Sequence, residues 1–429
     1  MRWSNWADTS SVCGIEVAEP AATAEVSALL REASEHGRRV RPIGAGHSFS
    51  AVARPVDLAV DLRRLCGVRV IADGGGRVRV GAGIVLGDLN AALAAHGLAL
   101  PNLGDIDRQR LAGALATGTH GTGGRLHGLA SAVTGLTLVT PDGQIHATAP
   151  GDGLFEAARI SLGALGVVTE VELATVPAFR LRAEEGPEPL DAVLADVDAF
   201  VASADHAEFF WFPHTRVAST RRNHRVDDGG GRPLPRWQSH LSDHLLGNRA
   251  YELVNRVGAA RPGWVPALNR LSAATLGRRT YTDASAQVFC SERSVRFAES
   301  EYALPRAAVV PALRDLRAWF DRTRAAVTFP LEVRFLAADD VWLSGAQGRA
   351  TAYVACHQHV RGGFADVFAA FETIMAAYDG RPHWGKLHTV DAARLAELHP
   401  HFEDFLAVRE RCDPARVLTN PHLERILGP

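Results

Sequence analysis

Arg39-Val-Arg-Pro-Ile-Gly-Ala-Gly-His-Ser-Phe49 is the stretch that decides the fold. Its first residues, Arg39 to Pro42, predict a strand that runs directly into a loop with two glycines and then His47. Glycines let the backbone approach a ligand closely, and successive N–H groups in such a loop can hold a phosphate. The sequence therefore predicts a ligand-binding loop with His47 beside whatever is bound.

A Rossmann dinucleotide fold would need Gly-x-Gly-x-x-Gly at the start of a helix, and here the third glycine is missing. Taken alone, the loop could be an ordinary turn. A second stretch, Leu111 to Gly124, holds five glycines and the hydroxyl residues Thr117, Thr119 and Thr122. A glycine-rich surface loop is the simpler alternative, but the small apolar residues in between favour a buried position against a flat or charged ligand.

Length and composition indicate an ordinary globular protein of two domains, with 429 residues, 47% hydrophobic and 22% charged. A net charge of −2 gives no reason to expect nucleic acid or an anionic membrane as partner. The first residues lack an apolar run and no stretch is long enough to span a bilayer, so we expect neither signal peptide nor transmembrane segment. Five scattered cysteines argue against a disulfide framework or a zinc ribbon and favour a reducing cytoplasm.

Periodicity predicts an α+β domain over residues 1–178 because its strands and helices do not alternate strictly. Turn signals at Asp73-Gly-Gly-Gly76 and Pro141-Asp-Gly143 predict two hairpins. Helices are expected at Thr23–Gly37 and Leu86–His96, and strands at Val56–Leu62, Val68–Ile71, Arg77–Val80, Val133–Thr140, Gln144–Thr148 and around Val171 and Leu173, ending near Pro177.

Residues 179–394 predict a second domain with helices over an antiparallel sheet, and residues 395–429 return to helix and are expected to pack back on the first domain. Arg221–Pro235, with its glycines and prolines, predicts a mobile loop. Strands are expected at Ala207–Phe212, Val327–Phe335 and Thr351–His359, and helices at Ala250–Val257, Arg306–Arg322 and Ala365–Tyr378.

Three groups in this second domain suggest chemistry, each with a plainer alternative. Glu332 and Arg334 share one face of a strand, which fits an active site or a simple ion pair. His357 and His359 also share a face, but no third ligand is visible, so we expect no metal. Lys386 follows Trp384-Gly385 and could be an ordinary surface lysine.

The ordered set of motifs resembles the vanillyl-alcohol-oxidase superfamily of FAD enzymes. Within it, the chain is similar to the sugar-lactone and alditol oxidases, which include L-gulono-1,4-lactone oxidases and dehydrogenases. The resemblance covers nearly the whole chain and rests on Gly44-Ala-Gly-His-Ser-Phe49, Pro101-Asn102 with Gly104-Asp105, Ala116-Thr-Gly-Thr-His-Gly-Thr-Gly123, Ser161-Leu-Gly-Ala-Leu-Gly-Val-Val168, Glu332-Val-Arg334, His383-Trp-Gly-Lys386, Asp413-Pro414 and Asn420.

The resemblance implies a two-domain vanillyl-alcohol-oxidase-type fold, with FAD in the first domain and a substrate (cap) domain after it. It places His47 where the family carries an 8α-histidyl bond to the flavin; a hydrogen-bonding loop histidine is the alternative. The residues implied to contact the cofactor are Ile43, Gly44, Ala45, Gly46, His47, Ser48, Phe49, Asn102, Gly104, Asp105, Gly113, Ala116, Thr117, Thr119, His120, Gly121 and Val168.

The same resemblance implies oxidation of an alcohol by hydride transfer to flavin N5. Glu332, Arg334 and Lys386 are the implied catalytic residues, and with Asp105 and His357 they would bind the substrate. Lys386 and Arg334 would stabilise negative charge on the reduced flavin, and Glu332 would hold substrate hydroxyls. The group that accepts the hydroxyl proton stays open, because neither Glu332 nor Arg334 suits that role at its ordinary pKa.

Gly104 falls where the family places a small gate residue beside the flavin, which favours access by dioxygen but leaves a cytochrome c-like acceptor open. Asp105 replaces the serine common in alditol oxidases. We therefore predict oxidation of a sugar lactone, such as L-gulono-1,4-lactone, at the C2 hydroxyl to an ascorbate-type product. The alternatives are an alditol oxidase acting on a terminal hydroxyl, and a flavin-carrying or sugar-binding protein without turnover.

Overall fold

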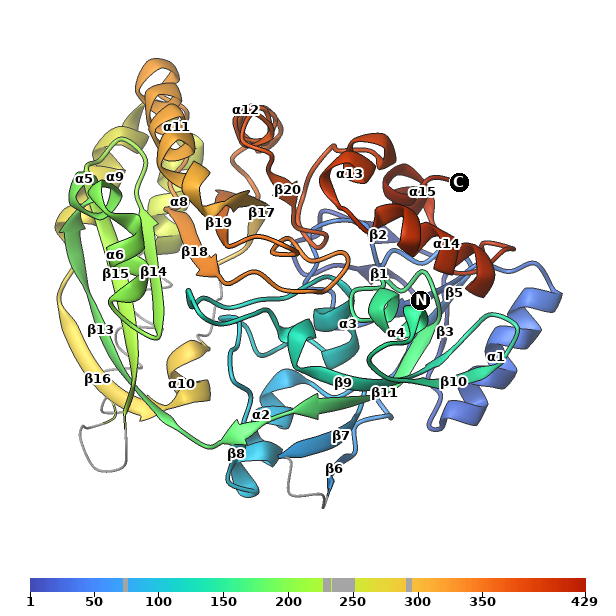
Figure 1. Ribbon diagram of the computed structural model, residues 1–429. Coiled ribbons are helices and arrows are strands. Elements are labelled where there is room, and N and C mark those ends of the chain that lie inside the picture. The colour runs from blue at the N-terminus through green and yellow to red at the C-terminus, as the bar shows by residue number, and fades with distance from the viewer. Residues whose placement is uncertain (72–75, 227–232, 234–250, 291–294) are drawn as a thin grey trace.

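The computed structural model describes residues 1–71, 76–226, 233, 251–290 and 295–429. Figure 1 shows an N-terminal α+β part beside a second part built on one large sheet, and three C-terminal helices, coloured red, that return to the first part. No helix in the described ranges combines the length and the apolar character needed to cross a bilayer.

The first part contains a parallel three-stranded sheet and an antiparallel five-stranded sheet. Both predicted hairpins are confirmed, since β6 pairs with β7 and β9 with β10; turn residues 73–75 lie outside the described residues. In sheet order, the strands are β3 (Glu16–Ala18), β5 (Leu58–Asp61) and β4 (Val40–Ile43), then β10 (Ile145–Thr148), β9 (Val133–Val139), β11 (Val167–Ala174), β7 (Arg77–Gly81) and β6 (Val68–Ile71).

The helices of the first part are amphipathic and cover these sheets. Val26, Leu30 and Ala33 form the buried stripe of α1, and Leu86, Leu89 and Leu93 form that of α2, as their spacing predicts. The predicted helices thus hold to within two residues at their ends. Their bounds are α1 (Thr23–Glu35), α2 (Leu86–Ala95), α3 (Leu111–Ala116) and α4 (Gly153–Ala158).

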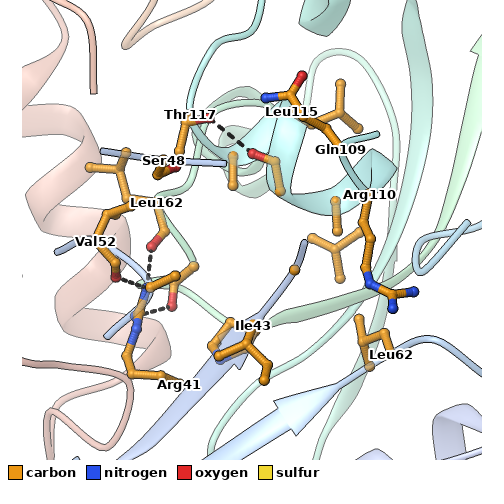
Figure 2. Close-up of a pocket in the computed structure, with 18 of the residues that line it drawn as sticks. Arg41, Ile43, Ser48, Val52, Leu62, Gln109, Arg110, Leu115, Thr117 and Leu162 are labelled. Atoms are coloured by element: carbon orange, nitrogen blue, oxygen red, sulfur yellow. Dashed lines mark hydrogen bonds between the residues drawn. The ribbon is translucent and has the colours of Figure 1, made fainter. Parts of the chain in front are cut away.

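The loop after β4 is fixed largely by hydrogen bonds to backbone carbonyls. Arg41 is fully buried and donates to the carbonyls of Val52, Leu162, Gly163 and Leu418, and dashed lines mark hydrogen bonds of its guanidinium in Figure 2. Burial and the nearby charge of Arg409 lower the pKa of Arg41 to about 9, so it is still charged near neutral pH. The buried guanidinium of Arg41 therefore holds the base of this loop in place.

The second part is one antiparallel sheet of eight strands with helices beside it (Figure 1). In sheet order, its strands are β16 (Arg279–Ala284), β13 (Arg180–Pro189), β15 (Val217–Val226), β14 (His206–Trp211), β18 (Leu331–Leu336), β19 (Thr351–His359), β17 (Phe297–Pro305) and β20 (Arg381–Pro382). Its helices are α5 (Leu190–Ala195), α6 (Val197–Ala202), α8 (Tyr251–Ala260), α9 (Val265–Ala274), α10 (Ser285–Phe289), α11 (Val309–Thr323) and α12 (Ala365–Ala376).

One prediction in this part is wrong in its first half. Residues 221–226, predicted as the start of a mobile loop, form the end of β15; all of them pair with β13, and residues 221–223 also pair with β14. The reason is charge pairing, because Arg221 and Arg222 each meet a glutamate on a neighbouring strand. Residues 227–232, 234 and 235 of that loop, and residue 250 of the expected helix, lie outside the described residues.

Two other predicted elements begin later than expected. The strand expected from Val327 begins at Leu331, and residues 306–308 of the expected helix form a short 3-10 turn before α11. Both Glu332 and Arg334 are nevertheless buried, so the charged face of β18 faces an interior.

The C-terminal helices α13 (Ala392–Leu398), α14 (Phe402–Cys412) and α15 (Pro421–Leu427) join the core of the first part. Phe402 and Leu418 belong to the same buried cluster as Val26 and Leu30. Asn420 joins the two chain segments directly, since its amide donates to the carbonyls of residues 51, 52 and 54 while its oxygen caps α15. We keep 1–178, 179–394 and 395–429 as a proposed division of the chain.

We predict that Asn420→Ala lowers the free energy of unfolding by about 2–4 kcal/mol, because it removes a helix cap together with the buried amide that donates to three backbone carbonyls of the first part. Asp391→Ala is the matched control, since Asp391 caps α13 through the N–H of Arg394 at an exposed site. Its loss should be about 1 kcal/mol. Urea unfolding at equal flavin content measures both, and equal losses would contradict the role given to Asn420.

Candidate active site

One cavity lies between the two glycine stretches, and we call it the glycine-loop cavity (Figure 2). A Cβ added at Gly113 would meet nothing within 4 Å, and one at Gly44 would meet only Arg110 Cβ, at 3.9 Å, so open space lies above both backbones. The two stretches that the sequence singled out therefore face a common space. The predicted residues that line it are Ile43, Gly44, Ala45, Gly46, His47, Ser48, Gly113, Ala116, Thr117 and Val168.

A second cavity, which we call the charged cavity, collects the predicted substrate residues. His47, Ser48, Gln109 and Thr117 line both cavities, so the two spaces meet beside His47. The predicted residues that line the charged cavity are His47, Ser48, Phe49, Gly104, Asp105, Thr117, Thr119, His120, Glu332, Arg334, His357 and Lys386.

Two predicted cofactor residues line neither cavity. The buried Asn102 side chain donates to the carbonyl of His127 and accepts from the N–H of Leu103. Gly121 packs so closely that an added Cβ would come within 2.1 Å of the Leu103 carbonyl oxygen. Both residues shape the loop that carries Gly104 rather than the cavity wall.

Lys386 is the only lysine among 46 lysine and arginine residues, and its ammonium stands inside the charged cavity. Its Nζ lies 2.6 Å from a carboxylate oxygen of Glu299, 3.8 Å from one of Glu301 and 5.1 Å from the ring centre of Phe49. Burial alone would lower the pKa of Lys386, but the two carboxylates raise it above its ordinary value. The site therefore holds a fixed positive charge, so the surface alternative is wrong.

Glu299 and Glu301 are the residues that sequence reasoning missed. They lie two apart on β17, so both face the cavity. Burial alone would raise the pKa of Glu299, but Lys386 and His357 lower it to about 2. The N–H of His383 and of Leu387 bond to the carbonyls of Glu301 and Glu299, so the same strand also holds the turn that carries Lys386. Their spacing of two residues could have shown that, on a strand, both carboxylates face the same side.

Arg334 is the second fixed cation of the charged cavity. It forms ion pairs with Glu332, its neighbour on the same face of β18, and with Asp105, whose oxygen lies 3.6 Å away. Burial opposes its charge, yet Glu332, Asp105 and Glu208 raise the pKa of Arg334 well above its ordinary value. The cation and the carboxylates thus stabilise one another in an interior where an unpaired charge would be costly.

Histidines complete the wall. The Nε2 of His357 lies 3.4 Å from Glu299 and 3.7 Å from Glu332, and it links the two charged groups. Within the described residues, a trio with the spacing of metal ligands is His120, Glu301 and His383 rather than the pair of His357 and His359. A metal ion there would face the Lys386 ammonium, 3.8 Å from Glu301, which disfavours it.

His47 stands where the cavities meet, with its ring stacked on Trp6 at 6.1 Å between ring centres. Burial lowers the pKa of His47, and the charges of Lys386 and Arg108 lower it further. The imidazole is therefore neutral near pH 7, which is the form that acts as a nucleophile.

Gly104 also lines the charged cavity. An added Cβ would stand 3.1 Å from the His120 carbonyl oxygen, so a methyl group fits there only if the backbone shifts by a few tenths of an ångström. The thiol of Cys290 lies 3.7 Å from the Gly104 carbonyl oxygen, and burial with the nearby Asp107 and Asp105 raises its pKa to about 12. The thiol beside Gly104 is therefore protonated near neutral pH.

Comparison with known proteins now assigns the family. The model of an FAD binding domain matches residues 16–149, and that of D-arabinono-1,4-lactone oxidase matches residues 171–426. The chain belongs to the D-arabinono-1,4-lactone oxidase family. The predicted resemblance and the enzyme class, an FAD-dependent oxidoreductase of CH–OH groups, are thereby confirmed.

Relatives of similar length support this assignment. The chain is 40% identical to an L-gulono-1,4-lactone dehydrogenase of Mycobacterium tuberculosis over 100% of this chain and 99% of the relative. It is 31% identical to the L-gulonolactone oxidase of Bos taurus and 34% identical to an alditol oxidase of Streptomyces, each over 99% of this chain and 98% of the relative.

A solved structure of cholesterol oxidase from Brevibacterium sterolicum aligns with a TM-score of 0.85 at 18% identity, over 100% of this chain and 96% of that one. At this identity the likeness concerns the fold alone. The predicted two-domain vanillyl-alcohol-oxidase-type fold is confirmed.

We predict that His383 makes the protein less stable in acid. Burial is the main cause that lowers its folded pKa to about 4, whereas the unfolded chain takes up a proton near pH 6.5. Stability is therefore unaffected above about pH 6.5 and falls as the pH drops from there towards 4, by about 2 kcal/mol at pH 5.

His383→Asn is the comparison, because its side-chain oxygen can replace Nδ1 as acceptor for the N–H of Gly385. The other buried histidines titrate in both proteins, so the difference in unfolding free energy isolates His383. Urea unfolding at pH 7, 6 and 5 should show the wild type losing about 2 kcal/mol more than the variant. Parallel pH curves would rule this role out.

Proposed function

We propose that the protein oxidises a sugar lactone, L-gulono-1,4-lactone or a related aldonolactone, at its C2 hydroxyl. The observation that carries the proposal is the junction of the two cavities at His47, with Lys386 and Arg334 fixed as cations in the second one. Relatives named for lactone oxidation span the whole chain and favour this substrate class. The 2-keto lactone would then tautomerise to an ascorbate-type enediol.

The residues present fit FAD. The glycine-loop cavity leaves the backbones of Gly44 and Gly113 open to a phosphate-bearing ligand, and Thr117 and Ser48 offer hydroxyls at the junction. In the proposed arrangement, these loops hold the phosphates, Val168 lies at the adenine end and His47 meets the isoalloxazine, bonded to its 8α carbon. When bound, FAD would supply the acceptor for the hydride that leaves the substrate carbon.

Each charged residue then has one task. Lys386 and Arg334 stabilise negative charge at the reacting end of the cavity, because fixed donors in a dry site need no reorganisation. Glu332, paired with Arg334, accepts hydrogen bonds from substrate hydroxyls. In the proposed mechanism His357, which lies between the carboxylates of Glu299 and Glu332, accepts the hydroxyl proton, and these two carboxylates balance the charge that it gains.

Asp105 favours lactones over the alternative, alditols oxidised at a terminal hydroxyl. It lies beside Arg334, so the cavity at that point presents a carboxylate paired with a cation rather than a neutral hydroxyl. The relative named alditol oxidase keeps that alternative as a second candidate. Gly104 supports dioxygen as acceptor, with a cytochrome c-like protein as the other choice, and the free cysteines Cys13, Cys66, Cys290, Cys356 and Cys412 suit a cytoplasmic setting.

We expect the flavin to stay with the chain after acid precipitation, because neutral His47 is placed to form the covalent bond. In His47→Ala the yellow colour should pass into the supernatant. His96→Ala, at an exposed helix end, is the control and should keep its colour. A wild-type pellet without colour would exclude the bond.

Lys386→Ala should slow anaerobic flavin reduction by a lactone about a hundredfold or more, since it removes a preorganised charge. Lys386→Arg keeps the charge but brings a wider, planar group between Glu299 and Glu301, so we expect about a tenfold loss. An unchanged rate in Lys386→Ala would remove this residue from the mechanism.

The same stopped-flow assay, run with a panel of aldonolactones and alditols, separates the candidate functions. Bleaching by lactones alone supports the proposal, bleaching by alditols alone favours the alternative, and no bleaching by either leaves a binding protein. Re-oxidation by air or by cytochrome c then distinguishes an oxidase from a dehydrogenase.

A further inference from the structure

A ladder of alternating charges crosses five strands of the large sheet and ends at Arg334. Arg334 on β18 stands opposite Glu208 on β14, and Glu208 stands opposite Arg221 on β15. Arg221 in turn stands opposite Glu185 on β13, which faces Arg279 on β16. Residues directly opposite in a sheet share one face, so these five side chains form a single row.

Every step of this row is an ion pair. The Nε of Arg334 lies 2.8 Å from Glu208, and Nη1 of Arg221 lies 3.2 Å from the same carboxylate. The Nε atoms of Arg221 and Arg279 lie 2.9 and 2.5 Å from Glu185. Side-chain exposure is 6% at Glu208 and 34% at Arg279, so the row runs from the interior to the surface.

Glu208 does not line the charged cavity, whereas Arg334 does. A guanidinium is planar, and a carboxylate on its Nε fixes the direction of the two terminal nitrogens. With Nε held by Glu208, Nη2 of Arg334 reaches Glu332 and Asp105 at the cavity. Glu208 therefore sets the orientation in which the Arg334 guanidinium faces a ligand in the charged cavity.

Arg221 has a matching role one strand further out. It gives Glu208 a second cation, so that Arg334 does not have to balance Glu208 alone while it also pairs with Glu332 and Asp105. Because Arg221 shares Glu208 and is itself held by Glu185, the carboxylate of Glu208 is both neutralised and kept in place.

We propose that Glu208 is a positioning residue for the oxidation, acting through Arg334 and held in register by Arg221 and Glu185. The link to catalysis rests on the proposed function, in which Arg334 touches the substrate. The placement of the guanidinium does not depend on it, so the two ideas can fail separately.

Glu208→Ala tests the proposal in a double-mutant cycle with Arg334→Ala. The rate of anaerobic flavin reduction should fall about tenfold to a hundredfold on Glu208→Ala in the wild-type background, a loss typical of a displaced positioning group. In the Arg334→Ala background the same change should cost less than about threefold, because the group it positions is gone. A loss of equal size in both backgrounds overturns the proposal.

The matched control is Glu188→Ala, which breaks an ion pair with Arg222 on the same strands β13 and β15 but outside the row. This variant should reduce its flavin at a rate within about twofold of the wild type, because the broken ion pair lies away from the reacting groups. If Glu208→Ala does not fold, Glu208→Gln keeps an acceptor for Nε without the charge, and about a threefold to tenfold loss is expected. No loss in that variant overturns the proposal.

A crystal structure of the Glu208 variant gives a readout that needs no substrate. The Arg334 guanidinium should turn away from its wild-type orientation, while the fold and flavin content stay unchanged. An unmoved guanidinium overturns the proposal even if activity falls. If no lactone or alditol bleaches the wild-type flavin, the proposed function fails and this structure still decides the role of Glu208.

Discussion

The backbone hydrogen bond from the N–H of Phe49 to the carbonyl of Gly385, 2.6 Å long, joins two loops that lie far apart in the sequence. The N–H of Ser50 reaches the same carbonyl, and the hydroxyl of Ser50 donates to the carbonyl of Trp384. The residues next to this junction are His47 and Lys386. The same backbone junction therefore positions His47, which would carry the flavin, and Lys386, which would act at its reacting end. A shift of one loop would move the other.

Burial of charge imposes the second constraint. Glu299, Glu301, Glu332, Arg334 and Lys386 are all largely shielded from water, and each would be costly without its partners. The chain uses arginine for every cation except one, and that exception stands between two carboxylates. A compact ammonium can approach both oxygens there, whereas a planar fork suits the in-register pairs of the sheet. The shape of the side chain thus explains why lysine stands between the two carboxylates and arginine in the pairs across the strands.

How far the sequence predicts this arrangement depends on whether a feature is local. The hairpins and the common face of Glu332 and Arg334 followed from turn residues and a spacing of two, and they are confirmed. Glu299 and Glu301 carried the same spacing, but nothing local marked them as partners of a lysine 85 or more residues later. Arg221 was misassigned because the glycines and prolines that follow it in the sequence are typical of a loop. Its ion pairs with Glu185 on β13 and Glu208 on β14 stabilise it within a strand, and these partners are distant in the sequence.

The seam between the two parts explains why the site depends on the whole chain. Thr122, in the second glycine stretch, donates to the Ala207 carbonyl and accepts from the N–H of Phe335, and the N–H of Gly123 bonds to the Phe335 carbonyl. These bonds attach the loop that follows α3 to β14 and β18, the strands of Glu208 and Arg334. The two parts are thus joined at this point by one threonine hydroxyl and one backbone hydrogen bond. These bonds hold the second glycine stretch against the strands that carry the charged face, and the two cavities meet beside His47 as a result.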